Sequence, residues 1–410
     1  MLLHAVLQRM VLEGRLSVVF GDGRVRNYGD GSGPPVAVRL TRAGERRIAR
    51  QPSLGLGEAY MEQDLVLDRG DLWDLLNLLG RNFRHERPRR HGLWSRLIAA
   101  IDRPLHQMND RIAARRNVAH HYDLSFDLYR RFLDEDLQYS CAYFARPDMS
   151  LEEAQAAKKV HIAAKLNLEP GLSVLDIGCG WGGMGLTLAG EYGARVTGVT
   201  LSQEQLAVAR RRAAESGLEA RAQFELSDYR DVRGAFDRIV SVGMFEHVGA
   251  PNYRAFFERI AALLPDDGLA VVHSIGRNGP PGVTDPFIAK YVFPGGYIPA
   301  LSEVLTAVEA AGLWVTDLEI LRLHYAETLK HWRQRFQAQR AAITLTYDDR
   351  FCRMWDYYLA ISELSFRYKD HMVFQLQLAK RVESAPLTRD YMIDGERREL
   401  ARIARRRAQA

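Results

Sequence analysis

Cysteine is scarce in this chain of 410 residues, which contains only Cys141, Cys179 and Cys352. Their spacing forms neither a pair nor a Cys/His cluster of the kind that disulfide frameworks and zinc sites use. We therefore expect no metal site and no structural disulfide. Free thiols of this kind are typical of a reducing cytoplasm.

Long apolar runs are also missing. No stretch approaches the roughly 18 uninterrupted apolar residues that a membrane-spanning helix needs. The first twenty residues have apolar residues at helical spacing, but His4, Gln8, Arg9 and Glu13 interrupt them, so the core of a signal peptide is absent. Any membrane contact is therefore expected at the surface of the bilayer.

The net charge of +5 is modest but unevenly distributed. Arginine is concentrated in residues 81–96 and again in residues 395–410. Such blocks favour anionic partners, either phospholipid head groups or nucleic acid, although a solvated linker and a frayed end have the same composition. The length predicts two or three compact units of ordinary globular composition.

The pattern of residues 1–80 predicts a small α+β unit. After a first helix, the alternating apolar residues of GRLSVVFGDG and PVAVRLT predict short strands. The segment DLWDLLNLLGRN then predicts a helix with Asp71 as its N-cap. The Arg- and Pro-containing segment from 81 to about 96 is the candidate linker.

Between about 160 and 320, short apolar strands alternate with helical patterns. The predicted strands are LSVLDIG, ARVTGVT, AQFELSD, FDRIVSVG and GLAVVHSIG. This alternation predicts βαβ units and a parallel sheet, with the strand ends and the ligand along one edge. Residues 279–299, rich in proline and glycine, predict an insertion that covers the pocket, and the aromatic-rich segment 326–380 is predicted to be helical.

A cluster of glycines lies in VLDIGCGWGGMGLTLA, residues 174–189. Each glycine loses more conformational entropy on folding than alanine would, so four within six residues indicate a backbone that a ligand approaches closely. Gly178, Gly180 and Gly183 satisfy the dinucleotide pattern G-x-G-x-x-G. That pattern requires an acidic residue about 20 positions later, where this chain has Thr200, so a nicotinamide dinucleotide is disfavoured.

LDIGCGWG instead resembles the first motif of class I S-adenosylmethionine-dependent methyltransferases, in which Asp176 would shape the loop. The chain as a whole resembles the cyclopropane-fatty-acyl-phospholipid synthases and the related mycolic acid cyclopropane synthases from about residue 115 to 380. The matching motifs are HYDLSFDLYRRFLDEDLQYSCAYF (121–144), GVTLSQEQ, MFEHVG (244–249), HSIG (273–276), FPGGYIP (293–299) and HYAETLKHW (324–332). SLGLGEAYMEQDLVLD in the N-terminal unit resembles the additional domain of the bacterial phospholipid enzymes.

The resemblance implies an α/β fold of the class I methyltransferase type, a Rossmann-like doubly wound sheet with a smaller N-terminal α+β domain. The implied domains are a lipid-binding domain over 1–80, a basic linker over 81–115, a catalytic domain with an acyl-chain pocket over 116–390 and a basic tail over 391–410. It also implies a homodimer, which does not bind nucleic acid, in the cytoplasm at the inner face of the membrane.

The family's reaction adds a methylene group from S-adenosylmethionine to the double bond of an unsaturated phospholipid acyl chain. An alkene is a poor nucleophile, so catalysis depends on alignment and on tolerating a carbocation. Loss of a proton from the added methyl then closes a cyclopropane ring. In the family a bicarbonate ion is the base.

The resemblance also implies the site residues. Those expected to contact the cofactor are Tyr139, Ser140, Asp176, Gly178, Gly180, Thr200, Gln205, Tyr229 and Arg230. Those expected to form the catalytic group around bicarbonate are Cys141, Glu246, His273, Ile275 and Tyr325, with Cys141 and Ile275 acting through their backbone. Glu246 and His273 also follow the strand pattern to its carboxyl end, where α/β sites form.

Several alternatives stay open. Tyr325 could belong to the core. Six further aromatic residues could face the carbocation, although a place in the core is favoured for each: Tyr291, Phe293, Tyr297, Trp355, Tyr357 and Tyr358. Where many phospholipid synthases carry a cysteine this chain has Ser362, followed by Glu363. A second carboxylate could accept a different proton, so a fatty-acyl C-methyltransferase that makes a methyl or methylene branch is the alternative function. An inactive lipid-binding protein is disfavoured by the intact catalytic group.

Overall fold

The computed structural model describes residues 2–83 and 125–409, which divide into two compact units. The first unit comprises residues 2–83, 283–294 and 329–371, and the second comprises the other described residues. Most of the basic linker predicted over 81–115 lies outside the described residues, as does the beginning of the motif at 121–144. The domain boundaries expected from the sequence stay a prediction.

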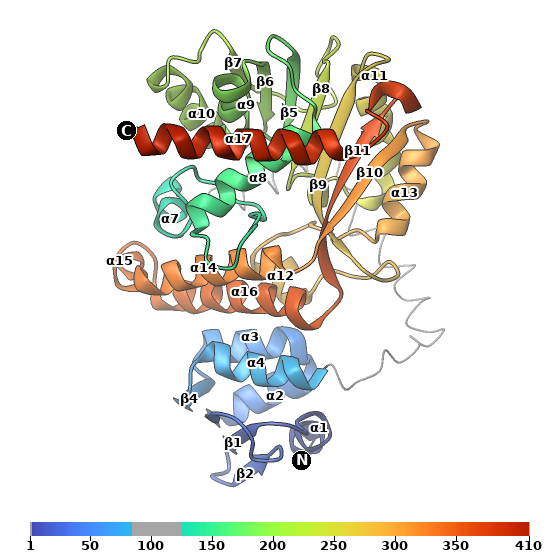
Figure 1. The fold of residues 1–410 in the computed structure, drawn as a ribbon. Coiled ribbons are helices and arrows are strands. Elements are labelled where there is room, and N and C mark those ends of the chain that lie inside the picture. Colours follow the sequence, from blue (N-terminus) through green and yellow to red (C-terminus); the bar gives the residue numbers. More distant parts are fainter. Residues whose placement is uncertain (1, 84–124, 410) are drawn as a thin grey trace. The chain divides into compact units, whose positions relative to one another are not determined.

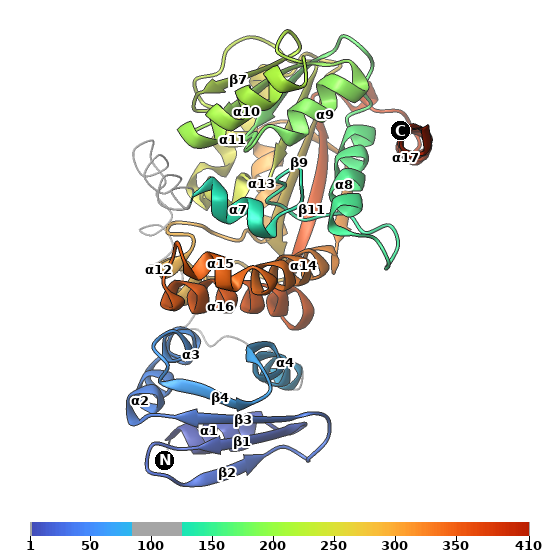
Figure 2. The ribbon, with the colours of Figure 1, turned by 90° about the vertical axis from the view of Figure 1, so that its left-hand side faces the viewer.

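The first unit contains a four-stranded sheet in the order β2-β1-β3-β4 (Figure 2). The strands are β1 (Arg15–Val19), β2 (Val25–Tyr28), β3 (Pro35–Leu40) and β4 (Leu65–Arg69). Alternate side chains of β1 and β3, such as Leu16, Val18, Val36 and Val38, are buried, as expected for a sheet with one covered face. Both strands predicted in this region are present.

Helices cover this sheet and extend the first unit. They are α1 (Leu2–Met10), α2 (Arg42–Arg50), α3 (Pro52–Met61), α4 (Leu72–Phe83), α12 (Pro286–Tyr291), α15 (Arg340–Thr344), α16 (Asp349–Tyr368) and part of α14 (His324–Ala338). Asp71 accepts a hydrogen bond from the Asp74 N–H (2.8 Å) and donates its own N–H to the Asp74 carboxylate (3.0 Å), which confirms the predicted N-cap.

The second unit contains a seven-stranded sheet in the order β10-β11-β9-β8-β5-β6-β7 (Figure 1). Its strands are β5 (Ser173–Ile177), β6 (Arg195–Thr200), β7 (Ala222–Leu226), β8 (Arg238–Val242), β9 (Leu269–Arg277), β10 (Trp314–Leu321) and β11 (His371–Ala379). The strands β5 to β9 pair in parallel, and β10 pairs antiparallel with β11. From β5 the chain adds β6 and β7 on one side, and then β8 and β9 on the other. The switch point between β5 and β8 is where ligands bind in such sheets.

Both faces of this sheet are covered by helices, because successive residues of each strand point to opposite sides. Val174 and Val196 pack with α8 (Leu151–Lys165), α9 (Gly183–Tyr192) and α10 (Gln203–Glu215), whereas Leu175 and Ile177 pack with α11 (Tyr253–Leu263) and α13 (Leu301–Ala310). The short α7 (Phe126–Phe132) precedes α8, and α17 (Asp390–Gln409) packs on α8. The predicted doubly wound fold is confirmed.

Two strands of the second unit were not predicted from the sequence, and neither were β2 and β4 of the first. The segment 326–380 was expected to be helical throughout, but its last part forms β11, and β10 precedes it. Nearly every residue of β11 is buried, including Gln375 and Gln377. A strand covered on both faces lacks the alternation that identifies strands, so its sequence cannot be distinguished by period from the end of a buried helix.

The segment 279–299 is divided between the units, because its residues 283–294 belong to the first. Its expected role as a cover for the pocket stays a prediction. Among the aromatic residues that could have faced a cation, Tyr297, Trp355, Tyr357 and Tyr358 are buried core residues. No helix within the described ranges is long and apolar enough to span a bilayer.

Gly57 provides a test of packing in the first unit. A Cβ at this position would lie 2.4 Å from Phe287 and 2.6 Å from Tyr357. Gly57→Ala should lower the melting temperature, because overpacking costs about 1–3 kcal/mol and exceeds the roughly 1 kcal/mol that alanine contributes within a helix.

Gly190 in α9 is the matched control, because its added Cβ would touch only the flexible end of Leu218 at 3.3 Å. Gly190→Ala should leave the melting temperature unchanged or raise it. Calorimetric unfolding of both variants decides. Equal stability of Gly57→Ala and the wild type would contradict the packing described above.

Candidate active site

The glycine loop connects the end of β5 to α9. Gly178, Gly180 and Gly182 have φ angles of 80°, 54° and 85°, a left-handed region that favours glycine. A Cβ on Gly178 would lie 2.8 Å from that of Met244, whereas a Cβ on Gly180 would meet no heavy atom within 4 Å. Gly178 therefore permits close packing within the protein, and Gly180 leaves space beside the backbone.

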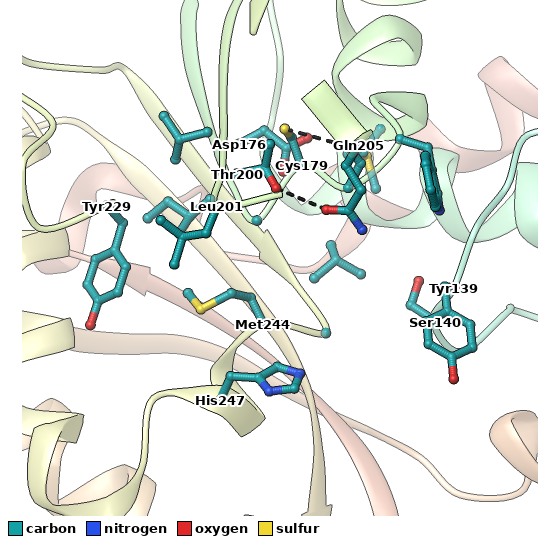
Figure 3. A pocket seen from close by; sticks show the side chains of 18 of the residues that line it. Tyr139, Ser140, Asp176, Cys179, Thr200, Leu201, Gln205, Tyr229, Met244 and His247 are labelled. Atoms are coloured by element: carbon teal, nitrogen blue, oxygen red, sulfur yellow. Dashed lines mark hydrogen bonds between the residues drawn. The ribbon is translucent and has the colours of Figure 1, made fainter. Parts of the chain in front are cut away.

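All nine residues expected to contact the cofactor line one pocket at the carboxyl edge of the parallel strands (Figure 3). They are Tyr139, Ser140, Asp176, Gly178, Gly180, Thr200, Gln205, Tyr229 and Arg230. The pocket also includes residues that sequence reasoning missed, among them Gln138, Asp228 and His247. The contacts of these residues with a cofactor stay a prediction.

Thr200 and Gln205 form a pair at the end of β6. The Thr200 hydroxyl donates to Gln205 Oε1 (2.9 Å), as the dashed line in Figure 3 marks. Ser202 caps α10 by accepting a hydrogen bond from the Gln205 N–H (3.2 Å). Because its amide oxygen accepts from Thr200, Gln205 has its NH2 group left as a donor beside the pocket.

Arg230 is held by Asp228 rather than being a free cation. Its Nε donates to Asp228 Oδ1 (2.8 Å) and its Nη2 to Asp228 Oδ2 (2.6 Å). Tyr229 packs edge-on against Phe256 with ring centroids 5.3 Å apart. The signal for Asp228 was its position as the last residue of the predicted strand AQFELSD.

Asp176 is a buried carboxylate in the pocket wall. Burial raises its pKa to about 7. Its Oδ2 has no hydrogen-bond partner among the described residues. A buried polar atom without a partner in the protein is suited to bind a ligand, and a ligand with an ammonium group, as adenosylmethionine has, fits this position.

Glu246 and Ile275 are brought into direct contact. Glu246 lies in a single 3-10 turn, Phe245–His247, after β8, and its Oε1 accepts a hydrogen bond of 2.6 Å from the Ile275 N–H in β9. Its Oε2 is buried and has no partner within the described part of the chain, and burial raises the pKa of Glu246 to about 7. The Ile275 N–H is thus engaged, and its carbonyl oxygen accepts a hydrogen bond from the Ser274 hydroxyl (2.9 Å), which leaves one lone pair of that oxygen for a ligand.

His273 is fixed by a residue that was missed. The Gln375 amide NH2 lies 3.1 Å from His273 Nδ1, which therefore accepts and leaves the ring proton on Nε2. Burial lowers the pKa of His273 well below its usual value, so the imidazole is neutral. Gln375 lies on β11. Its contact with His273 was not predicted, because this segment was expected to be helical.

The segment after Cys141 is joined to the first turns of α14, which contain Tyr325. The Ala142 N–H donates to Thr328 Oγ1 (3.0 Å), and the Phe144 N–H donates to His324 Nδ1 (3.0 Å). Burial raises the pKa of the Cys141 thiol, which keeps it protonated and agrees with a backbone role. The assembly of all five expected catalytic residues around one anion stays a prediction.

Glu363 is ion-paired within the first unit. Its Oε1 accepts a hydrogen bond from Arg367 Nε (2.8 Å), and Arg333 Nε lies 3.9 Å from its Oε2. The two arginines favour the ionised form of Glu363, but they also compete with any proton for its carboxylate oxygens.

Comparison with known proteins shows which family the chain resembles. Residues 109–376 match the family described as mycolic acid cyclopropane synthetase, and residues 2–85 match a domain of unknown function. The chain is 38% identical to the cyclopropane-fatty-acyl-phospholipid synthase of Escherichia coli strain K12, over 83% of this chain and 86% of that protein. It is 36% identical to the tuberculostearic acid methyltransferase UfaA1 of Mycobacterium tuberculosis, over 92% and 90% of the two chains.

Among solved structures, the cyclopropane synthase MmaA2 from Mycobacterium tuberculosis is similar to the chain with a TM-score of 0.63 and 35% identity. The match covers 65% of this chain and 98% of MmaA2. The glycine loop, the strand order and these similarities agree. The chain therefore belongs to the mycolic acid cyclopropane synthetase family and is an S-adenosylmethionine-dependent methyltransferase of class I fold.

Proposed function

We propose that the protein transfers a methylene group from S-adenosylmethionine to the double bond of an unsaturated phospholipid acyl chain and forms a cyclopropane. The observation that carries this proposal is Glu246 Oε2, a buried oxygen without a partner among the described residues. Met244 and His247, close to it in sequence, line the cofactor pocket. Ring closure needs a base beside the cofactor, and Glu246 Oε2 is an acceptor that could hold such a base there.

Adenosylmethionine, when bound, supplies an electrophilic methyl group. The glycine loop, Asp176 and the Thr200–Gln205 pair would hold it and align it with the alkene. Transfer of the methyl to the alkene would release S-adenosylhomocysteine and leave the positive charge on the acyl chain. The proton that closes the ring leaves from the added methyl.

The predicted catalytic group would hold a bicarbonate ion, which would supply the base for that proton. Glu246 Oε2 offers an acceptor for the bicarbonate O–H, and the neutral His273 offers Nε2–H as a donor. Tyr325 would donate its hydroxyl, and the backbone of Cys141 and Ile275 would complete the site. Acceptors and donors on one ligand match the chemistry of bicarbonate.

A fatty-acyl C-methyltransferase that gives a methyl- or methylene-branched chain is the second candidate. The similarity to tuberculostearic acid methyltransferase over 92% of the chain favours it. The two products differ in which proton leaves the carbocation. The pairing of Glu363 with Arg367 makes Glu363 a poor base for another proton and supports the ring.

Lipid analysis of a host that contains monounsaturated phospholipids tests the function. Expression of the wild type should add one CH2 to the acyl chains and give upfield methylene protons in NMR spectra. Glu246→Gln should abolish this product while the protein still binds S-adenosylhomocysteine. A branched-methyl or vinylic signal from the main product would contradict the cyclopropane synthase and identify the protein as a C-methyltransferase.

Bicarbonate dependence tests the base. In carbonate-depleted buffer, turnover of the wild type should fall and recover on addition of bicarbonate. Tyr325→Phe should lower kcat at least tenfold with little change in cofactor affinity, because the hydroxyl acts after cofactor binding.

Tyr192→Phe is the matched control, because the Tyr192 hydroxyl is buried in α9 without a hydrogen-bond partner in the described chain. Its kcat and its response to bicarbonate should equal those of the wild type. Undiminished turnover of the wild type without carbonate would rule out the bicarbonate part of the proposal.

We also propose that the protein acts in the cytoplasm, bound peripherally to the inner face of the membrane, and that it forms the homodimer expected from its family. Four arginines of the basic linker, Arg84, Arg87, Arg89 and Arg90, lie outside the described residues. Each basic side chain near an anionic surface contributes about 1 kcal/mol, and salt screens this attraction.

Co-sedimentation with vesicles tests the membrane contact. Binding to anionic vesicles should decrease as the salt concentration rises, and replacement of the four linker arginines by glutamine should weaken it. Equal binding to neutral and anionic vesicles would contradict the electrostatic contact.

A further inference from the structure

Lys158 is a fully buried cation whose hydrogen-bond acceptors are neutral. It lies in the middle of α8 with no exposed surface, and its ammonium group donates to Ser140 Oγ (2.8 Å) and to Gln138 Oε1. None of the ion pairs among the described residues includes it. Lysine is almost never buried completely without an acidic partner, because desolvation of the charge is costly.

The segment that Lys158 holds is part of the cofactor pocket. Residues 137–140 all line the pocket and belong to no helix or strand. Gln155, one turn before Lys158 in α8, donates its amide to the carbonyl oxygens of Gln138 (3.2 Å) and Ser140 (2.9 Å). One buried face of α8 thus satisfies both the backbone and the side chains of this wall.

The Gln138 amide is held at both ends. Its oxygen accepts from Lys158, and its nitrogen donates to Asp136 Oδ2 (2.9 Å). A Cβ on Gly183 would lie 2.2 Å from that nitrogen, so the amide also packs against the start of α9. Lys158 therefore holds an amide that lies between the 137–140 wall and the start of α9.

We propose that Lys158 is a positioning residue of the adenosylmethionine site, whose ammonium group fixes Gln138 and Ser140 and thereby shapes the pocket wall. This inference rests on the proposed function, because it takes adenosylmethionine to bind in this pocket. A charged donor makes hydrogen bonds about twice as strong as a neutral one. Loss of the proton from Lys158 therefore loosens the wall.

The groups around Lys158 place this loss within an accessible pH range. Asp134 and Asp136 from the turn after α7 raise its pKa, and so does Cys141, whereas burial and Lys159 lower it. Burial is the largest effect, and it lowers the pKa of Lys158 to about 8. The charge of Lys158 in turn lowers the pKa of Asp176 on β5 and of His273 on β9. The wall should loosen as the pH rises through about 8.

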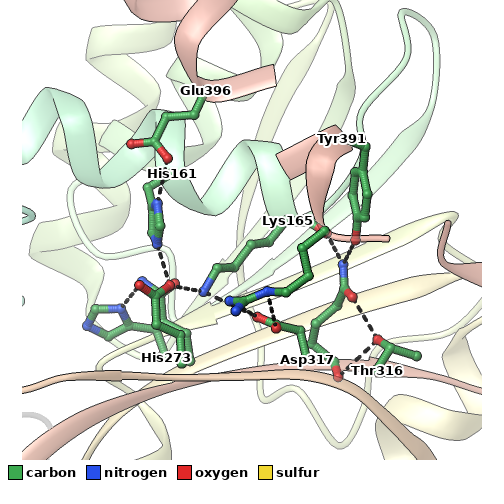
Figure 4. Close-up of polar contacts among 11 residues, drawn as sticks. His161, Lys165, His273, Thr316, Asp317, Tyr391 and Glu396 are labelled. Carbon is green, nitrogen blue, oxygen red and sulfur yellow. Dashed lines mark hydrogen bonds and ion pairs between the residues drawn. The ribbon is translucent and has the colours of Figure 1, made fainter. Parts of the chain in front are cut away.

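Lys165 offers a matched control on the same helix (Figure 4). It is also fully buried, but its ammonium group lies 2.5 Å from Glu319 Oε2 and 3.7 Å from Asp317 Oδ2. Neither carboxylate lines the cofactor pocket. Its replacement by methionine is the same chemical change at a position that does not hold the pocket wall.

The test is the affinity of the full-length protein for S-adenosylhomocysteine, measured by calorimetry. At pH 7.5, Lys158→Met should bind at least tenfold more weakly than the wild type, whereas Lys165→Met should bind within twofold of it despite a lower melting temperature. Equal affinity of Lys158→Met and the wild type would overturn the inference.

The pH profile separates positioning from a merely structural role. Between pH 7.5 and 9.5, affinity should fall more steeply for the wild type and Lys165→Met than for Lys158→Met, since the ligand's own amino group titrates equally in all three. Parallel profiles would count against Lys158. If Lys158→Met does not fold, Lys158→Gln, which keeps a neutral donor, should show the same flattened profile.

The lipid assay keeps the two proposals apart. A wild type that binds S-adenosylhomocysteine with the expected profile but makes no cyclopropane refutes the proposed function and supports the inference about Lys158. A wild type that binds no S-adenosylhomocysteine overturns both.

Discussion

The cofactor pocket depends on hydrogen bonds from one helix to a wall without regular structure. A buried segment outside helices and strands must find partners for its backbone N–H and C=O groups elsewhere. Here α8 provides them through Gln155, while Lys158 holds the side chains of the same segment. A helix normally turns its polar residues to water, but α8 turns them inward. The sheet fixes one side of the pocket, and this polar face of α8 fixes the other.

The same helix also connects the sheet to α17. His161 lies between two carboxylates, with Nε2 2.7 Å from Glu319 and Nδ1 3.0 Å from Glu396 (Figure 4). Its ring stacks on Tyr143 with centroids 4.1 Å apart, and Tyr143 stacks on His324 at 5.0 Å. Tyr143 and His324 are close in sequence to Cys141 and Tyr325 of the predicted catalytic group. Through His161, these two rings are connected to Glu319 and Glu396 by a continuous set of contacts.

The sequence predicted the part of the fold that local patterns determine. The strands β5 to β9 and the glycine loop are recognisable from short apolar runs that glycines and helical patterns separate. The ends of these strands meet at one edge of a parallel sheet. That is why Asp176 and Thr200 could be placed in one pocket. β11 could not be recognised, because burial on both faces removes the alternation that would identify it.

The missed site residues share a different cause. Lys158 stands in a stretch, EEAQAAKKVHIAAK, whose charges are typical of an exposed helix. Its burial results from tertiary packing, and the local sequence pattern does not indicate it. Gln375 likewise acquires its role only when β11 lies beside β9. Asp228 was easier to recognise, since it ends the predicted strand AQFELSD, but its pairing with Arg230 could be seen only in the structure.

The His273–Gln375 hydrogen bond joins residues that are 102 positions apart in the chain. Contacts over such a separation form late, because the entropy of closing the intervening loop must be overcome first. A growing chain can complete the glycine loop and β9 before β11 has been synthesised. The tautomer of His273 is then still free, so this imidazole acquires its orientation only after nearly the whole protein has been made.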